Sequence, residues 1–162
     1  MSICLYDFIA IFPSKRYTIS NLEGEDAMIS TKARYALRVM IDLAQHQENG
    51  YIPLKDIAKR QEISEKYLEI ILKTLVKGKI VKGLRGKGGG YMLTRLPKEY
   101  IIGEIIELTE GPLVSVACQM PDAVSCNRKD GCITLPLWKK FDSLVHDFFY
   151  HITLEDLING TF

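Results

Sequence analysis

One stretch, Pro53 to Arg95, constrains the fold more strongly than any other part of this 162-residue chain. Its middle carries apolar residues at helical spacing: Tyr67, Leu68, Ile71, Leu72, Leu75 and Val76. A period of 3.6 residues predicts an amphipathic helix with one face buried in a core. Ser64 precedes this helix, where its hydroxyl can accept a hydrogen bond from a free N–H group. Glu65 adds negative charge at the positive end of the helix dipole.

A shorter helix is predicted just before it, from Leu54 to Arg60, with a polar turn at residues 61–63 between the two. Two short helices joined by such a turn, the second basic on its free face, are typical of a helix-turn-helix. Strand-like runs follow at Ile80–Arg85 and Tyr91–Arg95. Between them lies Gly-Lys-Gly-Gly-Gly, residues 86–90, which suits a hairpin that needs positive φ. This order of elements predicts a winged helix-turn-helix.

Two other interpretations of the same stretch have to be weighed. A glycine-rich segment can form a nucleotide phosphate loop, but such a loop ends in Gly-Lys-Ser/Thr and opens a helix. Here the glycines lead into Tyr-Met-Leu-Thr and then Pro97, so we exclude a phosphate loop. Pairs of amphipathic helices are also common in ordinary core packing, and the helix-turn-helix pattern therefore needs independent support.

The distribution of charge gives that support. Residues 30–98 contain fifteen Lys and Arg against six Asp and Glu, a net charge of +9. Residues 99–162 contain four against ten, a net charge of −6. A basic region followed by an acidic one predicts a polyanion-binding head joined to a sensory or dimerising tail. We therefore expect a winged helix-turn-helix domain at 28–98 and a cysteine loop with a dimerisation region at 99–162.

The N-terminal residues 1–27 do not share the periodicity of the rest of the chain. We expect them to be a disordered extension, or sequence upstream of a true start at Met28. The apolar run near the N-terminus has no basic residue before it, which argues against a secretory signal. No apolar run approaches the roughly 18 residues that a membrane helix needs. We expect a cytoplasmic protein.

Three further helices complete a predicted fold that is mainly α-helical with a small β wing. Ser30 or Thr31 can cap a helix that runs to about Gln47, and a shorter helix is predicted from Ile102 to Leu108. A long helix follows from Pro136 to about His151. Its apolar stripe includes Trp138, Phe141, Leu144, Val145, Phe148 and Phe149. This stripe is larger than a helix needs when it follows a core that is already complete. We therefore expect the helix to pair with the same helix of a second copy of the chain.

The loop between residues 113 and 135 contains Cys118, Cys126 and Cys132. Thiols in a reducing compartment serve metals or redox chemistry more often than disulfides. Zinc would need a fourth ligand, and the nearest histidine, His146, lies fourteen residues beyond Cys132. The thiols can also be incidental. We expect no enzyme, because no Ser/His/Asp or Cys/His pairing stands at a plausible spacing.

Several segments resemble the Rrf-type family of bacterial winged-helix transcription regulators. They are Ile29–Leu37, Tyr67–Glu69, the wing sequence Arg-Gly-Lys-Gly-Gly-Gly-Tyr at 85–91, and Ile152–Leu157. The resemblance covers Met28 to Asn159. It implies a homodimer that binds a partly palindromic operator in double-stranded DNA and mostly represses transcription.

The family places its recognition helix in the major groove and its wing in the minor groove or on the backbone. By this resemblance Lys66, Glu69 and Ile70 read bases and Arg85 is the wing arginine. Glu69 can accept a hydrogen bond from a cytosine amino group, and Ile70 can pack on a thymine methyl group. Phosphate contacts, which position the protein without reading sequence, are expected from Lys32, Arg34, Lys55, Lys73 and Lys87.

The resemblance also implies that Cys118, Cys126 and Cys132 hold an iron–sulfur cluster, which we expect to be 2Fe–2S. The family takes its fourth ligand from positions that hold Leu135 and Arg34 in this chain, and neither side chain can ligate iron. The fourth ligand stays open at this stage. The candidates are Asp122, Asp130, His146, the partner subunit or a small thiol.

Two alternatives to a cluster-sensing regulator follow from the same residues. The first keeps the DNA-binding head but is free of a cluster, and is controlled by a regulatory protein partner or a small ligand on the acidic half. The second is an iron–sulfur redox or carrier protein that docks an acidic partner on its basic face.

Overall fold

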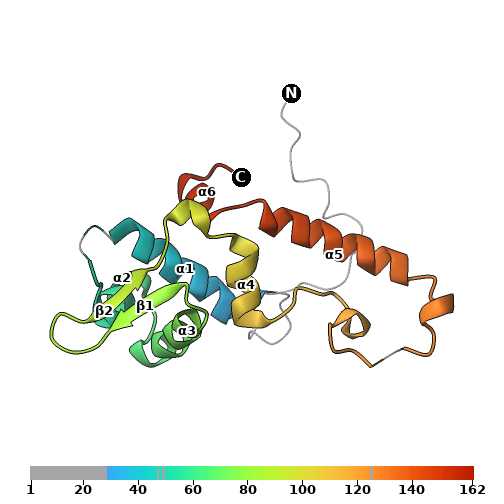
Figure 1. The fold of residues 1–162 in the computed structure, drawn as a ribbon, viewed down its shortest axis with the longest axis horizontal. Coiled ribbons are helices and arrows are strands. Elements are labelled where there is room, and N and C mark those ends of the chain that lie inside the picture. The colour runs from blue at the N-terminus through green and yellow to red at the C-terminus, as the bar shows by residue number, and fades with distance from the viewer. Residues whose placement is uncertain (1–28, 47, 49, 125) are drawn as a thin grey trace, which may run out of the picture.

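The computed structural model describes residues 29–46, 48, 50–124 and 126–162. The expected extension 1–27 lies outside these residues, as does Gln47. The helices are α1 (Thr31–His46), α2 (Leu54–Gln61), α3 (Glu65–Lys77), α4 (Ile102–Glu110), α5 (Leu135–Tyr150) and α6 (Leu154–Asn159). The strands are β1 (Val81–Leu84) and β2 (Gly90–Leu93), and short 3-10 turns occupy Pro97–Glu99, Ala117–Gln119 and Lys129–Gly131. The predicted fold class, mainly helical with one small wing, is confirmed (Figure 1).

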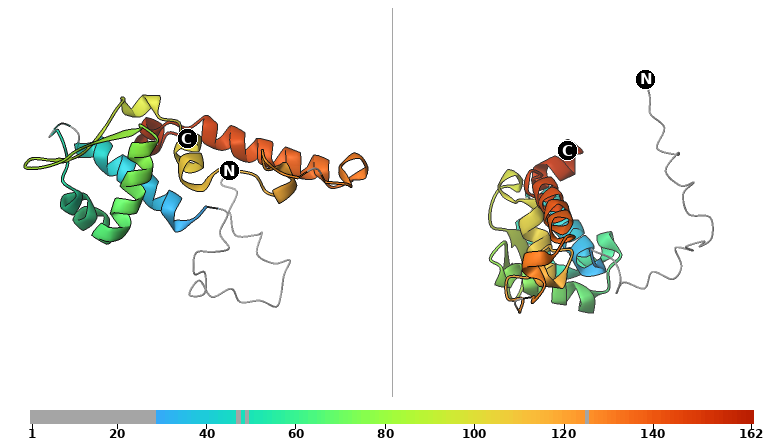
Figure 2. Two further views of the ribbon diagram at one scale, coloured as in Figure 1. Left: turned by 60° about the horizontal axis from the view of Figure 1, so that its bottom comes forward. Right: turned by 90° about the vertical axis from the view of Figure 1, so that its right-hand side faces the viewer.

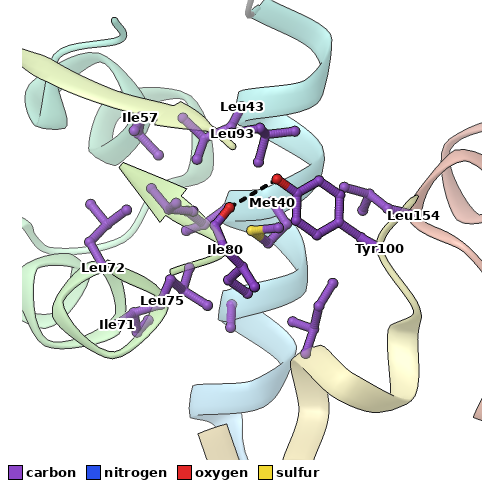
Figure 3. Packing of buried hydrophobic residues seen from close by; sticks show 14 of the residues in the cluster. Met40, Leu43, Ile57, Ile71, Leu72, Leu75, Ile80, Leu93, Tyr100 and Leu154 are labelled. Carbon is purple, nitrogen blue, oxygen red and sulfur yellow. Dashed lines mark hydrogen bonds between the residues drawn. The ribbon is translucent and has the colours of Figure 1, made fainter. Parts of the chain in front are cut away.

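Helix α1 lies at the centre of the core. It contacts α2, α3 and β2 on one side and α4 and α6 on the other. Its residues Ala36, Val39, Met40 and Leu43 are fully buried, at the spacing of one helical face. Figure 3 shows Met40 and Leu43 between the side chains of α3, the hairpin and Leu154 of α6. The C-terminal helix α6 therefore packs in the same core as the helix-turn-helix.

The wing is an antiparallel hairpin in which Val81 pairs with Leu93 and Leu84 pairs with Gly90. Its base is tied to the loop before α2, because Ile52 and Tyr91 exchange backbone hydrogen bonds of 2.9 and 2.8 Å. Gly90 is required by this close approach: a Cβ there would lie 2.3 Å from the Ile52 carbonyl oxygen. The glycines at 86 and 88 have φ of +96° and +76°, as the predicted hairpin demanded.

Tyr100 fastens the end of the wing to the core. Its hydroxyl accepts the backbone N–H groups of Thr94 at 2.8 Å and Arg95 at 2.7 Å. It also donates to the Ile80 carbonyl at 3.0 Å, the bond drawn in Figure 3. The residue is only 1% exposed, so water cannot replace these bonds. One buried hydroxyl thus holds both ends of the hairpin in place.

Helix α5 projects away from the core, and the loop that precedes it in the chain, between α4 and α5, extends in the same direction (Figures 1 and 2). None of its sixteen residues, all described by the structure, is buried. The helix returns to the core at Tyr150, whose hydroxyl donates to Glu107 of α4 at 2.7 Å. Burial, together with Glu107, raises the pKa of Tyr150 to about 12. Thr153 caps α6, since its hydroxyl accepts the N–H of Asp156.

Among the helices that the structure describes, none combines the length and the apolar character required to cross a membrane.

Replacing Tyr100 with phenylalanine tests how the wing is held. The Tyr100→Phe change keeps the buried ring but leaves the N–H groups of Thr94 and Arg95 without their acceptor. We expect the free energy of unfolding to fall by about 1–3 kcal/mol, measured by urea denaturation. Tyr51→Phe is the matched control, and we expect it to cost less than about 0.5 kcal/mol.

Candidate nucleic-acid interface and cysteine cavity

The exposed face of α3 presents the residues that the sequence assigned to base reading. Lys66 and Glu69 are exposed and Ile70 is 50% exposed, whereas the opposite face of the helix is buried. Lys73, which was assigned to a phosphate contact, is exposed as well. Ser64 caps the helix by accepting the N–H of Tyr67 at 3.3 Å, as predicted. The helix therefore starts at a defined residue and turns a fixed face to solvent.

Helix α2 is held against α1 by a buried carboxylate. Asp42 is 1% exposed and accepts two hydrogen bonds from the Arg60 guanidinium, at 2.8 and 2.7 Å, and one from Gln61 at 3.0 Å. Burial alone would raise the pKa of Asp42, but the bonds from Arg60 and Gln61 outweigh it and lower that pKa. The turn after α2 follows at once, with Glu62 in the left-handed region at φ +55°. These contacts set the position of α3 relative to α1.

A groove of about 780 Å³ runs between α3 and the wing. Four of the predicted DNA contacts line it together: Lys55 from α2, Glu69 and Lys73 from α3, and Arg85 from the wing. The groove is thus lined by both basic side chains and carboxylates of α3, which suits contact with both phosphates and base amino groups. Lys87 is exposed at the tip of the wing and does not line the groove.

Lys32 and Arg34 lie elsewhere, in the first turn of α1. The Lys32 ammonium donates to the Thr109 carbonyl at the end of α4, at 2.9 Å, and Arg34 donates to the Thr31 hydroxyl. In return, the Glu110 carboxylate accepts the N–H of Ala33 at 3.2 Å. The positive N-terminal end of α1 is therefore capped by a carboxylate from α4, and the negative C-terminal end of α4 is capped by an ammonium group from α1.

Sequence reasoning missed Glu110 and Asp42 as positioning residues. Glu110 also accepts a bond from the Ser30 hydroxyl, eighty residues away, and no local pattern announces a contact at that separation. Asp42 stands between apolar residues of α1 at a position that helical periodicity alone would allow to face solvent.

The three cysteines of the loop line one cavity of about 400 Å³. Cys118 and Cys126 are exposed and Cys132 is half-buried. The Thr134 hydroxyl, 3.5 Å from the Cys132 sulfur, lowers the pKa of that thiol. Within the described part of the chain, no three His, Cys, Asp or Glu side chains stand close enough to hold a metal ion. The cavity therefore gathers three thiols without closing them around a common centre.

Asp142 of α5 fixes the start of this loop to the long helix. Its carboxylate accepts the N–H of Ser115 at 2.9 Å and the side-chain amide of Gln119 at 2.6 Å. The candidate fourth ligands Asp122, Asp130 and His146 do not line the cavity. Leu135 lines it but has no atom that can ligate iron.

Helix α5 carries an exposed apolar stripe. Leu137, Phe141, Leu144 and Phe148 are between 41% and 60% exposed and follow one another at three or four residues, so they share one face. Trp138, Val145 and Phe149 are half-buried, and Phe149 packs against the core. The predicted dimerisation residues thus divide between an open stripe and the side of the helix that turns toward the rest of the chain.

Comparisons with known proteins agree with this architecture. The family model Rrf2, described as iron-dependent transcriptional regulator, matches residues 29–160. The HTH-type transcriptional regulator IscR of Pectobacterium atrosepticum is 37% identical over 132 residues, which cover 82% of this chain and 79% of that protein.

Two solved structures share the fold. The IscR of T. potens superposes with a TM-score of 0.66 at 34% identity, covering 83% of this chain and 88% of that one. The global cysteine regulator CymR of B. subtilis superposes with a TM-score of 0.65 at 36% identity, covering 83% and 98%. The matched proteins are named as transcriptional regulators, which confirms the expectation of a regulator and not an enzyme. This chain belongs to the Rrf2 family of transcriptional regulators.

Proposed function

We propose that this regulator binds an operator in double-stranded DNA as a homodimer, mostly as a repressor, and senses redox, iron–sulfur or nitrosative status at its cysteine loop. The observation that carries the DNA-binding part is the groove that brings Lys55, Glu69, Lys73 and Arg85 around one surface. The charge of +9 over residues 30–98 supports the same assignment. Binding to DNA places the protein in the cytoplasm.

The exposed face of α3 has the dimensions of a recognition helix. Thirteen residues rise about 20 Å, and a helix of this kind fits a major groove about 12 Å wide. Lys66, Glu69 and Ile70 then face base edges while Lys73 and Arg85 reach phosphates. In this proposal Lys87, exposed near the tip of the wing, contacts the next stretch of backbone.

Replacing Lys73 with glutamine tests the phosphate contact. We expect Lys73→Gln to weaken binding to all DNA sequences alike, and to reduce the slope of log affinity against log salt by about one, because one fewer counterion is released. Fluorescence anisotropy over 50–300 mM salt measures both effects. Lys98→Gln removes an exposed lysine of the turn 97–99, which does not line the groove, and should leave the slope unchanged. Equal slopes for wild type and Lys73→Gln would contradict the assignment.

A second copy of the chain is the proposed partner for the open stripe of α5. Apolar side chains at this spacing form a continuous seam when two such helices pack. The arrangement would join two α3 helices in one particle, as a partly palindromic operator requires.

Replacing two residues of the stripe tests this interface. We expect the double change Leu144→Glu and Phe148→Glu to convert the dimer to monomer at micromolar concentration, because two carboxylates would be buried in an apolar seam. Sedimentation equilibrium measures the change. Ser143→Glu adds a carboxylate to the same helix outside the stripe and should leave the dimer intact. A wild-type chain that is already monomeric would refute the proposal.

Cys118, Cys126 and Cys132 are the residues proposed to hold the iron–sulfur cluster. Their soft sulfur donors suit iron–sulfur chemistry, and they share one cavity, although they provide three of the four donors that each common cluster type requires. Such a group, when bound, supplies a change of charge and ligation with redox state. The chain's own part is to place three thiolates at the far end of α5 and to anchor the loop through Asp142.

The first part of the loop is connected both to the proposed dimer helix and to the DNA-binding core. Asp142 joins it to the proposed dimer helix through Ser115 and Gln119, and Glu110, just before the loop, caps α1. A change of loop conformation would therefore act on the seam and on the base of the DNA-binding core together. This gives a two-state element that the cysteine site can bias.

Iron and sulfide analysis of protein purified without oxygen tests the cysteine site. We expect about two irons and two sulfides per chain with a visible absorption band, and loss of both in Cys126→Ala. A colourless, metal-free dimer that still binds DNA would favour the alternative of control by a protein partner or small ligand. A stable cluster with no affinity for any DNA would favour a redox or carrier protein.

A further inference from the structure

The turn between α2 and α3 is held by two residues of α1, Arg38 and Asp42, which lie one helical turn apart. Both contact Gln61, the last residue of α2. The side-chain amide of Gln61 donates to Asp42 at 3.0 Å, and its side-chain oxygen accepts a hydrogen bond from Arg38 Nε at 3.2 Å. The backbone carbonyl of Gln61 accepts a second bond from Arg38, through Nη2. Helix α1 therefore fixes both the side chain and the backbone of the residue that precedes the turn.

Arg38 also contacts an aromatic pair that joins α1 to the recognition helix. Its guanidinium carbon lies 5.1 Å from the centre of the Tyr35 ring, a cation–π contact. The Tyr35 ring meets the Tyr67 ring edge to face, with 5.9 Å between the ring centres and 77° between the planes. Tyr67 lies in the first turn of α3, next to Lys66 and two residues before Glu69. One guanidinium thus reaches the turn before α3 directly and the first turn of α3 through one ring.

We propose that Arg38 is a positioning residue for sequence readout, which orients α3 through Gln61 and Tyr35. This inference rests on the DNA-binding function proposed above. Contacts to base edges require side chains held within about 0.5 Å of the correct geometry. Lysines on flexible stems can follow phosphates over larger displacements, and these contacts carry no sequence information. A small change in the orientation of α3 therefore lowers the discrimination between DNA sequences more than the affinity for DNA as such.

The geometry of these contacts requires an arginine. Nε and Nη2 are two donors on one rigid plane, and they bind two acceptors of Gln61 while the guanidinium also lies over Tyr35. A lysine has the same charge but only a single ammonium centre. Arg38 is exposed, so its loss should leave the buried core of the domain intact. A simpler role for an exposed cation is a phosphate contact, and in that role a lysine would replace it.

The test compares one selected DNA duplex with a scrambled duplex of the same composition. The wild-type chain first selects duplexes of about 30 base pairs, three helical turns, from a random pool. Fluorescence anisotropy then gives both dissociation constants, and their ratio measures discrimination. We expect Arg38→Ala and Arg38→Lys each to lower this ratio about tenfold. The affinity for the scrambled duplex should stay within about twofold of the wild type, with an unchanged salt slope.

Two further variants complete the test. Lys59→Ala is the matched control, because it removes an exposed cation of α2 that does not line the groove, and the ratio should not change. Tyr35→Leu removes the ring and should lower the ratio to the same extent as Arg38→Ala. The double variant should be no worse than either single one, because both changes break the same connection. Urea denaturation checks that each variant is folded.

An unchanged ratio in Arg38→Ala would overturn the proposal. Full rescue by Arg38→Lys would also overturn it, because that result would indicate a phosphate contact. Equal loss of affinity for the two duplexes, with a lower urea midpoint, would show that Arg38 supports only the fold. These three outcomes leave the DNA-binding function standing. Failure of the wild-type chain to enrich any duplex would overturn that function together with the role of Arg38.

Discussion

The burial of α1 is the constraint on which the rest of the structure depends. Each of the other long elements of the core packs against this helix, so its orientation decides where the recognition helix and the wing lie. The helix also buries one charge, Asp42, and a buried carboxylate destabilises a fold unless it is fully paired. Arg60 and Gln61 supply that pairing from α2. We infer that the ion pair fixes the position of α2 on α1 more than it raises the free energy of unfolding. A shift of α2 along α1 would leave the Asp42 carboxylate without its partners.

The ends of α1 and α4 show the same use of charge at a smaller scale. The N-terminus of α1 is positive and receives the Glu110 carboxylate, while the carbonyl of Thr109 near the end of α4 receives the Lys32 ammonium. Both contacts lie at the point where the chain leaves the core for the cysteine loop. They are partly exposed, so each contributes modestly and can be broken without unfolding the domain.

The elements with a strong local pattern were predictable from the sequence, and the contacts between distant residues were not. Helix α3, its Ser64 cap and the glycine hairpin follow from spacing and turn chemistry within about thirty residues. The role of Tyr100 could not be predicted in this way, because a buried tyrosine resembles any other core aromatic residue until the partners of its hydroxyl are known. Lys32, assigned to phosphate by family resemblance, donates to a protein carbonyl in the structure. The three cysteines are not spaced with the period of a helix or a strand. The sequence therefore predicted that they share a loop, but not how their side chains are arranged in it.

The junction of α4 and α5 differs from these weaker contacts. Gly103 lets the ring of Tyr150 rest on the backbone of α4, where a Cβ would lie 2.3 Å from the ring. The imidazole of His146 stacks on the same Tyr150 ring, with 4.0 Å between the ring centres. With its pKa raised to about 12 by burial and by Glu107, the Tyr150 hydroxyl stays protonated and keeps donating to Glu107 at neutral pH. The end of α5 at Tyr150 is therefore fixed to the core, while Asp142, midway along the helix, is joined to the cysteine loop through hydrogen bonds to Ser115 and Gln119. A rearrangement of the loop would consequently turn α5 about this junction, and any partner packed on its apolar stripe would turn with it.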